Sequence, residues 1–280
     1  MILNYPLKSL EICQSEKIKH MKTPVDLKIG LIQSDTIWHQ TDLNLINIEK
    51  KIKSSQHNNV NLWVLPEMFN SGFTSQPELV YENMKGNTII WMKKIAFNYN
   101  SAIVGSIVVK ENGSFYNRLI FAYPDKKIVY YDKKHLFTFS GENKMFKSGN
   151  KNILINYLGW NIRPLVCYDL RFPVWYRNTD NFDLVLYVAN WPKTRINAWD
   201  SLLKARAIEN MSYSLGVNRI GEDANNLIYP GHSSCYDFFG STLFFMDFKD
   251  DVGFIDLSYS NLHLIRKKYP FLMDRDNFDF

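Results

Sequence analysis

Residues 163–173 read RPLVCYDLRFP, and this stretch does most to decide the fold. Its first part belongs to a short apolar run, 162–166, of the kind that forms a buried strand, and a helix-like segment follows. Cys167 therefore stands where the strand ends. Strand ends in α/β proteins are where ligands bind, because the sheet stops there and the following loops open a crevice. A thiol at this position is expected to face the surface and to add little packing.

Two other segments place a reactive polar residue directly after an apolar strand. In Leu62–Glu67 (LWVLPE) a carboxylate follows the strand, and in Tyr130–Phe137 (YYDKKHLF) two lysines follow one. A thiolate needs a neighbouring base or cation, a carboxylate can carry a proton to a leaving amine, and an ammonium group can stabilise an oxyanion. Glu67, a lysine and Cys167 would therefore suffice for acyl transfer to water.

The lysine of this set is either Lys133 or Lys134. Adjacent side chains of an extended segment face opposite sides, so only one of the two can reach the site. The chemistry of the residues does not choose between them. His135 and His232 leave open a papain-like pairing of cysteine with histidine, although structural hydrogen bonds are the expected role of both. Cys235 is predicted to be a buried residue of a strand.

Around these segments, short apolar strands alternate with stretches of helical periodicity. Helices are predicted near 42–53, 83–98 and 197–210. The predicted strands are 27–33, 60–65, 102–109, 115–123, 127–131, 153–157, 162–167, 183–189, 212–219, 234–238, 242–248 and 253–257. Strands outnumber helices, and helices enter between groups of strands. Two packed sheets with helices outside satisfy this order better than one doubly wound sheet.

The chain shows neither a linker nor an internal repeat, so residues 21–280 are predicted to form a single domain. Residues 1–20 end before a second methionine, Met21, and lack the apolar run of a signal peptide. They are predicted to be an N-terminal extension that is not part of the fold. The longest apolar stretches, such as 184–191, are far too short to span a membrane.

Composition excludes several function classes. The 33 Lys and Arg against 28 Asp and Glu give a mild formal charge of +5. Nucleic-acid binding is not expected, because a concentrated basic patch and a recognition motif are both missing. The three cysteines, Cys13, Cys167 and Cys235, form no disulfide spacing pattern, which fits a reducing cytoplasm. The six histidines are scattered, and no metal or nucleotide motif occurs, which indicates a hydrolase without a cofactor.

Leu65–Phe69 (LPEMF), Asp132–Phe137 (DKKHLF) and Val166–Pro173 (VCYDLRFP) resemble, in chain order, the signature segments of the nitrilase superfamily of carbon–nitrogen hydrolases. The resemblance extends from Lys28 to about Phe278. It implies an α/β fold, a four-layer α-β-β-α sandwich, and a homodimer. It also implies the site residues, which are the triad Glu67, Lys133 and Cys167, and Glu142, which orients the lysine and the substrate.

Further segments resemble the bacterial omega-amidase branch of that superfamily. They are Asn190-Trp191-Pro192 with the following Arg195, and Tyr269–Leu272 (YPFL). The resemblance implies a cysteine-nucleophile amidase that cleaves a small amide. Members of this branch hydrolyse the terminal amide of short dicarboxylate monoamides such as 2-oxoglutaramate. An N-carbamoyl amino acid or a nitrile is the alternative substrate, and a catalytically silent scaffold is a third alternative that the intact triad disfavours.

A dicarboxylate monoamide carries a carboxylate remote from the reacting carbonyl, and arginine can bind both oxygens of that group. Arg195 is the preferred anion clamp, because its only nearby acid in the sequence is Asp200. Arg171 is a second candidate, for which an ion pair with Asp169 or another carboxylate is the more expected role. Trp191 and Phe137 are expected as apolar walls, and the backbone N–H of Tyr168 is expected to bind the oxyanion beside Lys133.

Overall fold

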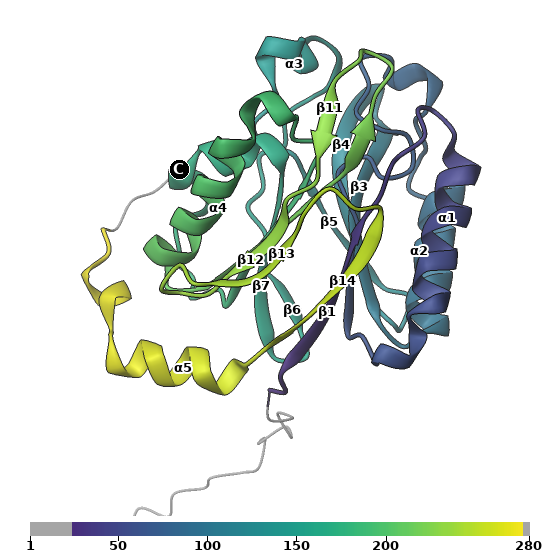
Figure 1. The fold of residues 1–280 in the computed structure, drawn as a ribbon. Coiled ribbons are helices and arrows are strands. Elements are labelled where there is room, and N and C mark those ends of the chain that lie inside the picture. The colour runs from purple at the N-terminus through teal and green to yellow at the C-terminus, as the bar shows by residue number, and fades with distance from the viewer. Residues whose placement is uncertain (1–23, 277–280) are drawn as a thin grey trace, which may run out of the picture.

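The computed structural model describes residues 24–276, so the extension predicted for residues 1–20 lies outside the described part. Two six-stranded sheets form the centre of the molecule (Figure 1). The first sheet contains, in spatial order, β14 (Asp251–Leu257), β1 (Leu27–Gln33), β2 (Leu62–Val64), β3 (Ala102–Glu111), β4 (Ser114–Ala122) and β5 (Ile128–Asp132). The second contains β13 (Thr242–Met246), β12 (Ser233–Tyr236), β9 (Tyr213–Asn218), β8 (Leu184–Ala189), β7 (Trp160–Val166) and β6 (Ile155–Tyr157).

Each sheet has three parallel strands at its centre and antiparallel strands at its sides. The parallel sets are β1–β2–β3 and β7–β8–β9. Their side chains are almost entirely buried on both faces, as is typical of parallel strands, and this explains why the sequence shows them as continuous apolar runs. The carboxyl ends of these parallel strands lie on one edge of each sheet, where the loops that follow them can meet.

Helices cover the outer face of each sheet (Figure 1). α1 (Thr41–Ser54) and α2 (Asn87–Asn98) pack against the first sheet through Ile48, Met92 and Ile95, which share a core cluster with Trp63. α4 (Ile196–Asn210) covers the second sheet through Trp199, Leu203 and Ala207. The predicted four-layer α-β-β-α arrangement is confirmed.

The largest core cluster fills the space between the two sheets and continues beneath α4. It joins Leu31 and Val64 of the first sheet to Leu165, Leu186 and Leu215 of the second. Burial of this apolar surface supplies the main driving force for holding the sheets together. A rigid double sheet results, and it fixes the positions of the strand ends that carry the reactive residues.

Among residues 24–276, two α-helices and two strands were not predicted: α3 (Glu142–Met145), α5 (Tyr259–Lys268), β10 (Ile220–Glu222) and β11 (Ile228–Pro230). α5 buries Leu262 and packs on the core through Tyr259 and Ile265 as well, so it has a short apolar stripe that the prediction missed. Ser258 accepts a hydrogen bond from the backbone N–H of Asn261 as its N-cap. The hairpin of β10 and β11 is short and stands apart from both sheets. Within residues 24–276, no helix has the length and apolar character needed to cross a membrane.

Candidate active site

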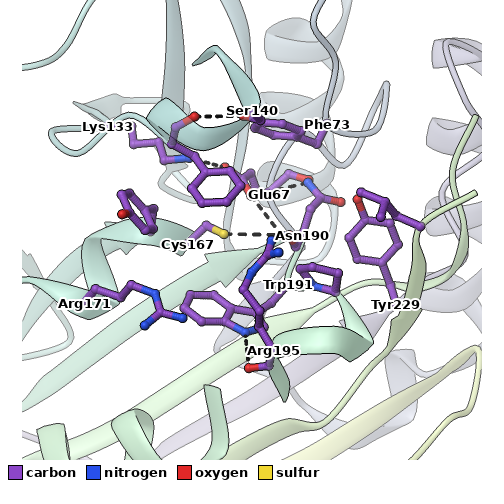
Figure 2. Close-up of a pocket in the computed structure, with 14 residues that line it drawn as sticks. Glu67, Phe73, Lys133, Ser140, Cys167, Arg171, Asn190, Trp191, Arg195 and Tyr229 are labelled. Carbon is purple, nitrogen blue, oxygen red and sulfur yellow. Dashed lines mark hydrogen bonds and ion pairs between the residues drawn. The ribbon is translucent and has the colours of Figure 1, made fainter. Parts of the chain in front are cut away.

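The ends of three strands bring Glu67, Lys133 and Cys167 to one pocket (Figure 2). Glu67 follows β2, Lys133 follows β5 and Cys167 follows β7. Lys133 Nζ lies 2.9 Å from Glu67 Oε1. The Nζ atom of Lys134 instead lies 4.9 Å from the centre of the Trp175 ring. Two adjacent lysines thus point in different directions, and it is Lys133 that faces the carboxylate.

Glu142 belongs to the same cluster and comes from the short helix α3 (Glu142–Met145). Its Oε2 and Oε1 atoms lie 2.9 and 3.0 Å from Lys133 Nζ. The carboxylate also accepts a hydrogen bond from the backbone N–H of Phe137, which closes the loop between the lysine and the helix. Lys133, Glu67 and Glu142 are all at most 1% exposed. The ammonium group is therefore buried between two carboxylates.

Two asparagines that the sequence did not single out hold Glu67 in place. Asn117 Nδ2 donates to Glu67 Oε1 at 2.7 Å, and the backbone N–H of Asn190 donates to Oε2 at 2.9 Å. The side-chain amide of Asn190 donates to the backbone carbonyl of Glu67 at 2.7 Å. These contacts to the Glu67 side chain all come from N–H donors, which hold the carboxylate in one orientation. Asn190 follows β8, so the strand-end pattern alone could have drawn attention to it.

Burial and charge set the protonation states. Burial, followed by the charge of Glu67, raises the pKa of the Cys167 thiol well above its ordinary value, and Lys133 offsets this only in part. Burial alone would lower the pKa of Lys133, but Glu142 and Glu67 outweigh burial and raise it. Burial also raises the pKa of Glu142, against the opposing effect of Lys133. These directions predict a neutral thiol beside an ammonium group in the resting cluster.

Cys167 begins a 3₁₀ helix, Cys167–Arg171, with φ of 45°. The left-handed region is rare for residues other than glycine and costs free energy, so the surrounding structure must hold this conformation. The side chain is 9% exposed, so the expectation of a surface-facing thiol was wrong. The reason is that Cys167 lies in a pocket, whose lining includes Phe137 and Trp191 from the loops that follow other strands.

Aromatic and cationic side chains line the rest of this pocket. Phe137 and Trp191 both lie in the lining, and so do Tyr168, Arg171 and Arg195. Trp191 is fixed by its ring N–H, which donates to the carbonyl of Arg195 at 2.8 Å. Within the described part of the chain, the only acidic side chain of the lining is Glu67. The pocket is therefore apolar in its walls and carries positive charge away from the triad.

The two guanidinium groups stack on aromatic rings. Arg195 Cζ lies 4.9 Å from the centre of the Phe137 ring, and Arg171 Cζ lies 5.1 Å from that of Trp191. The ion pair expected between Arg171 and Asp169 does not form, because Asp169 accepts hydrogen bonds from other residues. Among residues 24–276, neither guanidinium group has an ion pair with a carboxylate. Both remain available to an anion in the pocket.

The carboxylates that could have bound these arginines are bonded to histidines. Asp169 Oδ1 lies 2.8 Å from Nδ1 of His135, and Asp200 Oδ2 lies 2.9 Å from Nδ1 of His232. The structural hydrogen bonds expected for the two histidines are confirmed. Neither histidine lines the pocket that contains Cys167.

The unpredicted hairpin closes one side of the pocket with Leu227 and Tyr229. Tyr229 donates a hydrogen bond to Asp223 Oδ2 at 2.8 Å, and its ring lies 4.7 Å from the guanidinium carbon of Arg219. Nothing in the local sequence pattern distinguishes this hairpin from an ordinary surface loop. In the described residues, no group of three or more His, Cys, Asp and Glu side chains is arranged to hold a metal ion.

Known proteins show which family the chain belongs to. The family model described as carbon-nitrogen hydrolase matches residues 28–267. The chain belongs to the carbon–nitrogen hydrolase family. Omega-amidase YafV of Escherichia coli (strain K12) is 38% identical over 254 residues, which cover 90% of this chain and 98% of that protein. The 2-oxoglutaramate amidase of Bacillus subtilis (strain 168) is 33% identical over 222 residues, or 77% of this chain and 84% of that one.

Solved structures of carbon–nitrogen hydrolases have the same fold. A superfamily member from Xanthomonas campestris, which carries an arsenic adduct in its active site, has a TM-score of 0.89 and 38% identity, and the match covers 91% of this chain and 99% of that chain. A member of branch 10 of the nitrilase superfamily from Saccharomyces cerevisiae has a TM-score of 0.78 and 22% identity over 88% of this chain and 95% of its own. At 22% identity, the similarity to the yeast protein shows a shared fold.

Proposed function

We propose that this carbon–nitrogen hydrolase is an omega-amidase, which uses Cys167 as nucleophile to release ammonia from a dicarboxylate monoamide resembling 2-oxoglutaramate. The observation that carries the proposal is the composition of the pocket. It combines a buried thiol, a lysine held between two carboxylates, and two arginines that have no carboxylate partner among the described residues. The relatives named for omega-amidase and 2-oxoglutaramate amidase activity support the same substrate class.

In the proposed first half-reaction, Cys167 attacks the amide carbonyl and its proton passes to Glu67. Lys133 and the backbone N–H of Tyr168 stabilise the oxyanion of the tetrahedral intermediate. Glu67 then delivers the proton to the nitrogen as the C–N bond breaks, which releases ammonia and leaves a thioester. The contact of 2.9 Å between Lys133 and Glu67 supports this assignment, because it keeps the ammonium group beside the base.

In the second half-reaction, Glu67 removes a proton from a water molecule, and the resulting hydroxide attacks the thioester. Collapse of the second tetrahedral intermediate breaks the C–S bond, and the thiolate recovers the proton from Glu67. Glu142 keeps Lys133 oriented throughout, since both of its oxygens contact Nζ. Arg195 binds the remote carboxylate and Arg171 provides a second positive charge, while Trp191 and Phe137 enclose the chain between the two ends.

The substrate class is tested by measuring ammonia release from 2-oxoglutaramate, a neutral short amide, an N-carbamoyl amino acid and a short nitrile. We expect the highest kcat/KM for 2-oxoglutaramate. Highest activity on the carbamoyl compound would favour the N-carbamoyl alternative and overturn the proposal, and so would hydrolysis of the nitrile in preference to the other three. A silent scaffold would release ammonia from none of them.

We also propose a homodimer in a reducing compartment such as the cytoplasm. The resemblance to the superfamily supports the dimer, and the two described cysteines, which are both free thiols, support the compartment. Light scattering of the purified protein would test the first statement, with a monomer as the contrary result. Localisation of a tagged chain in its own cell would test the second, with a secreted product as the contrary result.

A further inference from the structure

A second carboxylate that no part of the proposed reaction uses lies directly behind the site. Asp169 is completely buried and does not line the pocket. Its Oδ1 accepts hydrogen bonds from the backbone N–H and from Nδ1 of His135, at 2.9 and 2.8 Å. Its Oδ2 accepts from the backbone N–H of Val166 at 3.0 Å and from the hydroxyl of Tyr131 at 2.9 Å. One carboxylate therefore satisfies four donors.

These donors belong to the two segments that carry the reactive groups. Tyr131 and His135 stand two residues before and two residues after Lys133, and Val166 directly precedes Cys167. The Tyr131 hydroxyl also accepts a hydrogen bond from the backbone N–H of Lys134 at 3.2 Å. Asp169 thus ties the lysine segment to the cysteine turn at the point where the cysteine adopts its left-handed conformation. A strained residue of this kind persists only where neighbouring contacts hold it.

The imidazole ring of His135 is held by two contacts, one with Asp169 and one with Phe172. It stacks on Phe172 with ring centres 4.0 Å apart and an angle of 9° between the planes. Stacking fixes the ring plane, and Nδ1 then faces Asp169. Because Asp169 accepts here, Nδ1 carries the proton that it donates. The ring therefore has the geometry of a hydrogen-bond donor to a carboxylate, rather than that of a base for the sulfur atom.

We propose that Asp169 is a positioning residue, which sets the separation between the Lys133 ammonium group and the Cys167 sulfur atom, and that His135 serves it as a hydrogen-bond donor. The inference rests on the proposed function of those two residues. Displacing either group from its partner would slow thiolate formation and the chemical step. Substrate binding would change little, because Asp169 does not line the pocket and, among the described residues, forms no hydrogen bond or ion pair with Arg171 or Arg195.

The first test compares two substitutions of His135 in the full chain. His135→Ala deletes the donor, whereas His135→Asn places an amide nitrogen where Nδ1 was. We measure kcat and KM for ammonia release and, separately, the rate at which iodoacetamide alkylates Cys167. For His135→Ala we expect both kcat and the alkylation rate to fall about tenfold, with KM within about threefold, and His135→Asn to restore both to within about threefold of wild type. Equal impairment of the two variants would overturn the inference and favour an imidazole base.

The second test is Asp169→Asn, which replaces one acceptor oxygen by an NH₂ group that faces two donors. We expect a loss of about 100-fold in kcat with little change in KM, as for other small misplacements of reacting groups. A folded Asp169→Asn variant with wild-type kcat would overturn the inference, and if this variant does not fold, the His135 pair decides. His263→Ala is the matched control, because His263 on α5 pairs through Nε2 with Asp183 at 3.3 Å, and it should retain activity within about twofold.

The two proposals can fail separately. Turnover that survives in Cys167→Ala would refute the proposed function, whichever substrate is used. Alkylation of Cys167 requires no substrate, so it reports on the geometry between the two segments even if the natural amide is a different one. Unchanged alkylation rates in both His135→Ala and Asp169→Asn would refute the positioning role while leaving the amidase proposal intact.

Discussion

The ammonium group of Lys133 lies 2.9 Å from the carboxylate of Glu67, although 66 positions of sequence separate the two residues. Glu142 binds the same ammonium group from the other side, also at 2.9 Å. Removing one partner from such a buried cluster leaves an uncompensated charge, which typically costs about 3–5 kcal/mol. The same three residues therefore serve the proposed reaction and contribute to the stability of the fold. A substitution in this cluster should lower both kcat and the free energy of unfolding.

Cys167→Ala should abolish ammonia release, because no other described thiol lies in the pocket. Cys235→Ala is the matched control: Cys235 is fully buried in β12 and does not line the pocket, so reagents and substrate should not reach its thiol. Activity assays with mass spectrometry of iodoacetamide-treated protein check both variants. Ammonia release by Cys167→Ala, or label on Cys235 at a rate like that of Cys167, would contradict the assignment of the nucleophile.

Lys133→Ala should lower kcat by about three or more orders of magnitude, as for other groups that act as a unit. It should also lower the free energy of unfolding, because Glu67 and Glu142 lose their shared counterion. Lys134→Ala should keep activity within about threefold, since its ammonium group lies over the ring of Trp175 and points away from the carboxylates. Steady-state kinetics and denaturant unfolding measure the two effects.

The pair Glu67→Gln and Lys133→Ala tests whether the two residues act together. The loss in the double variant should be close to that of the more damaging single variant, because either substitution disables the same step. Losses that add on a logarithmic scale would indicate independent roles. A damaging Lys134→Ala combined with a mild Lys133→Ala would shift the assignment by one residue.

Arg195→Ala should weaken the anionic substrate selectively. One charge-assisted hydrogen-bonded contact contributes about 1.5–3 kcal/mol, so kcat/KM for 2-oxoglutaramate should fall by about one to two orders of magnitude. The neutral short amide should be affected far less. Arg171→Ala provides the comparison, because this guanidinium group is likewise half-buried and stacked on a pocket aromatic. Equal losses on charged and neutral amides for Arg195→Ala would argue against the anion clamp.

The pH dependence of thiolate formation follows from the raised pKa of Cys167. A thiol whose pKa is raised stays protonated at a pH where a free cysteine has begun to ionise, so the free enzyme should show no thiolate absorbance below about pH 9. The difference in ultraviolet absorbance between wild type and Cys167→Ala measures it. A step in this difference near or below neutral pH would indicate a preformed thiolate ion pair, and would contradict the neutral resting state.

The sequence by itself determined which residues stand at strand ends. Leu27–Gln33 and Leu62–Val64 are so strongly apolar that their strands could be predicted within a few residues, and Trp160–Val166 could be predicted likewise although it contains Arg163. Glu67 and Cys167 follow such runs closely, and this alone places them at the edge of the sheets. Lys133 could be chosen over Lys134 only through the resemblance to the superfamily. Alternation along a strand shows that the two side chains face opposite sides, but it does not show which side faces the site.

Only the tertiary structure decided the contacts between distant segments. Asn117 on β4 and Asn190 after β8 bind Glu67 from different sheets. The strand-end position of Asn190 marks it as a site candidate, but no local pattern of either residue identifies Glu67 as its partner. Asp169 bonds to His135 rather than to Arg171, which leaves the arginine free in the pocket. The periodicity of a helix or strand indicates which face of that element a residue occupies, but it does not indicate which distant residue lies opposite that face. Partners across the sandwich depend on how the two sheets pack, and this is a property of the whole chain.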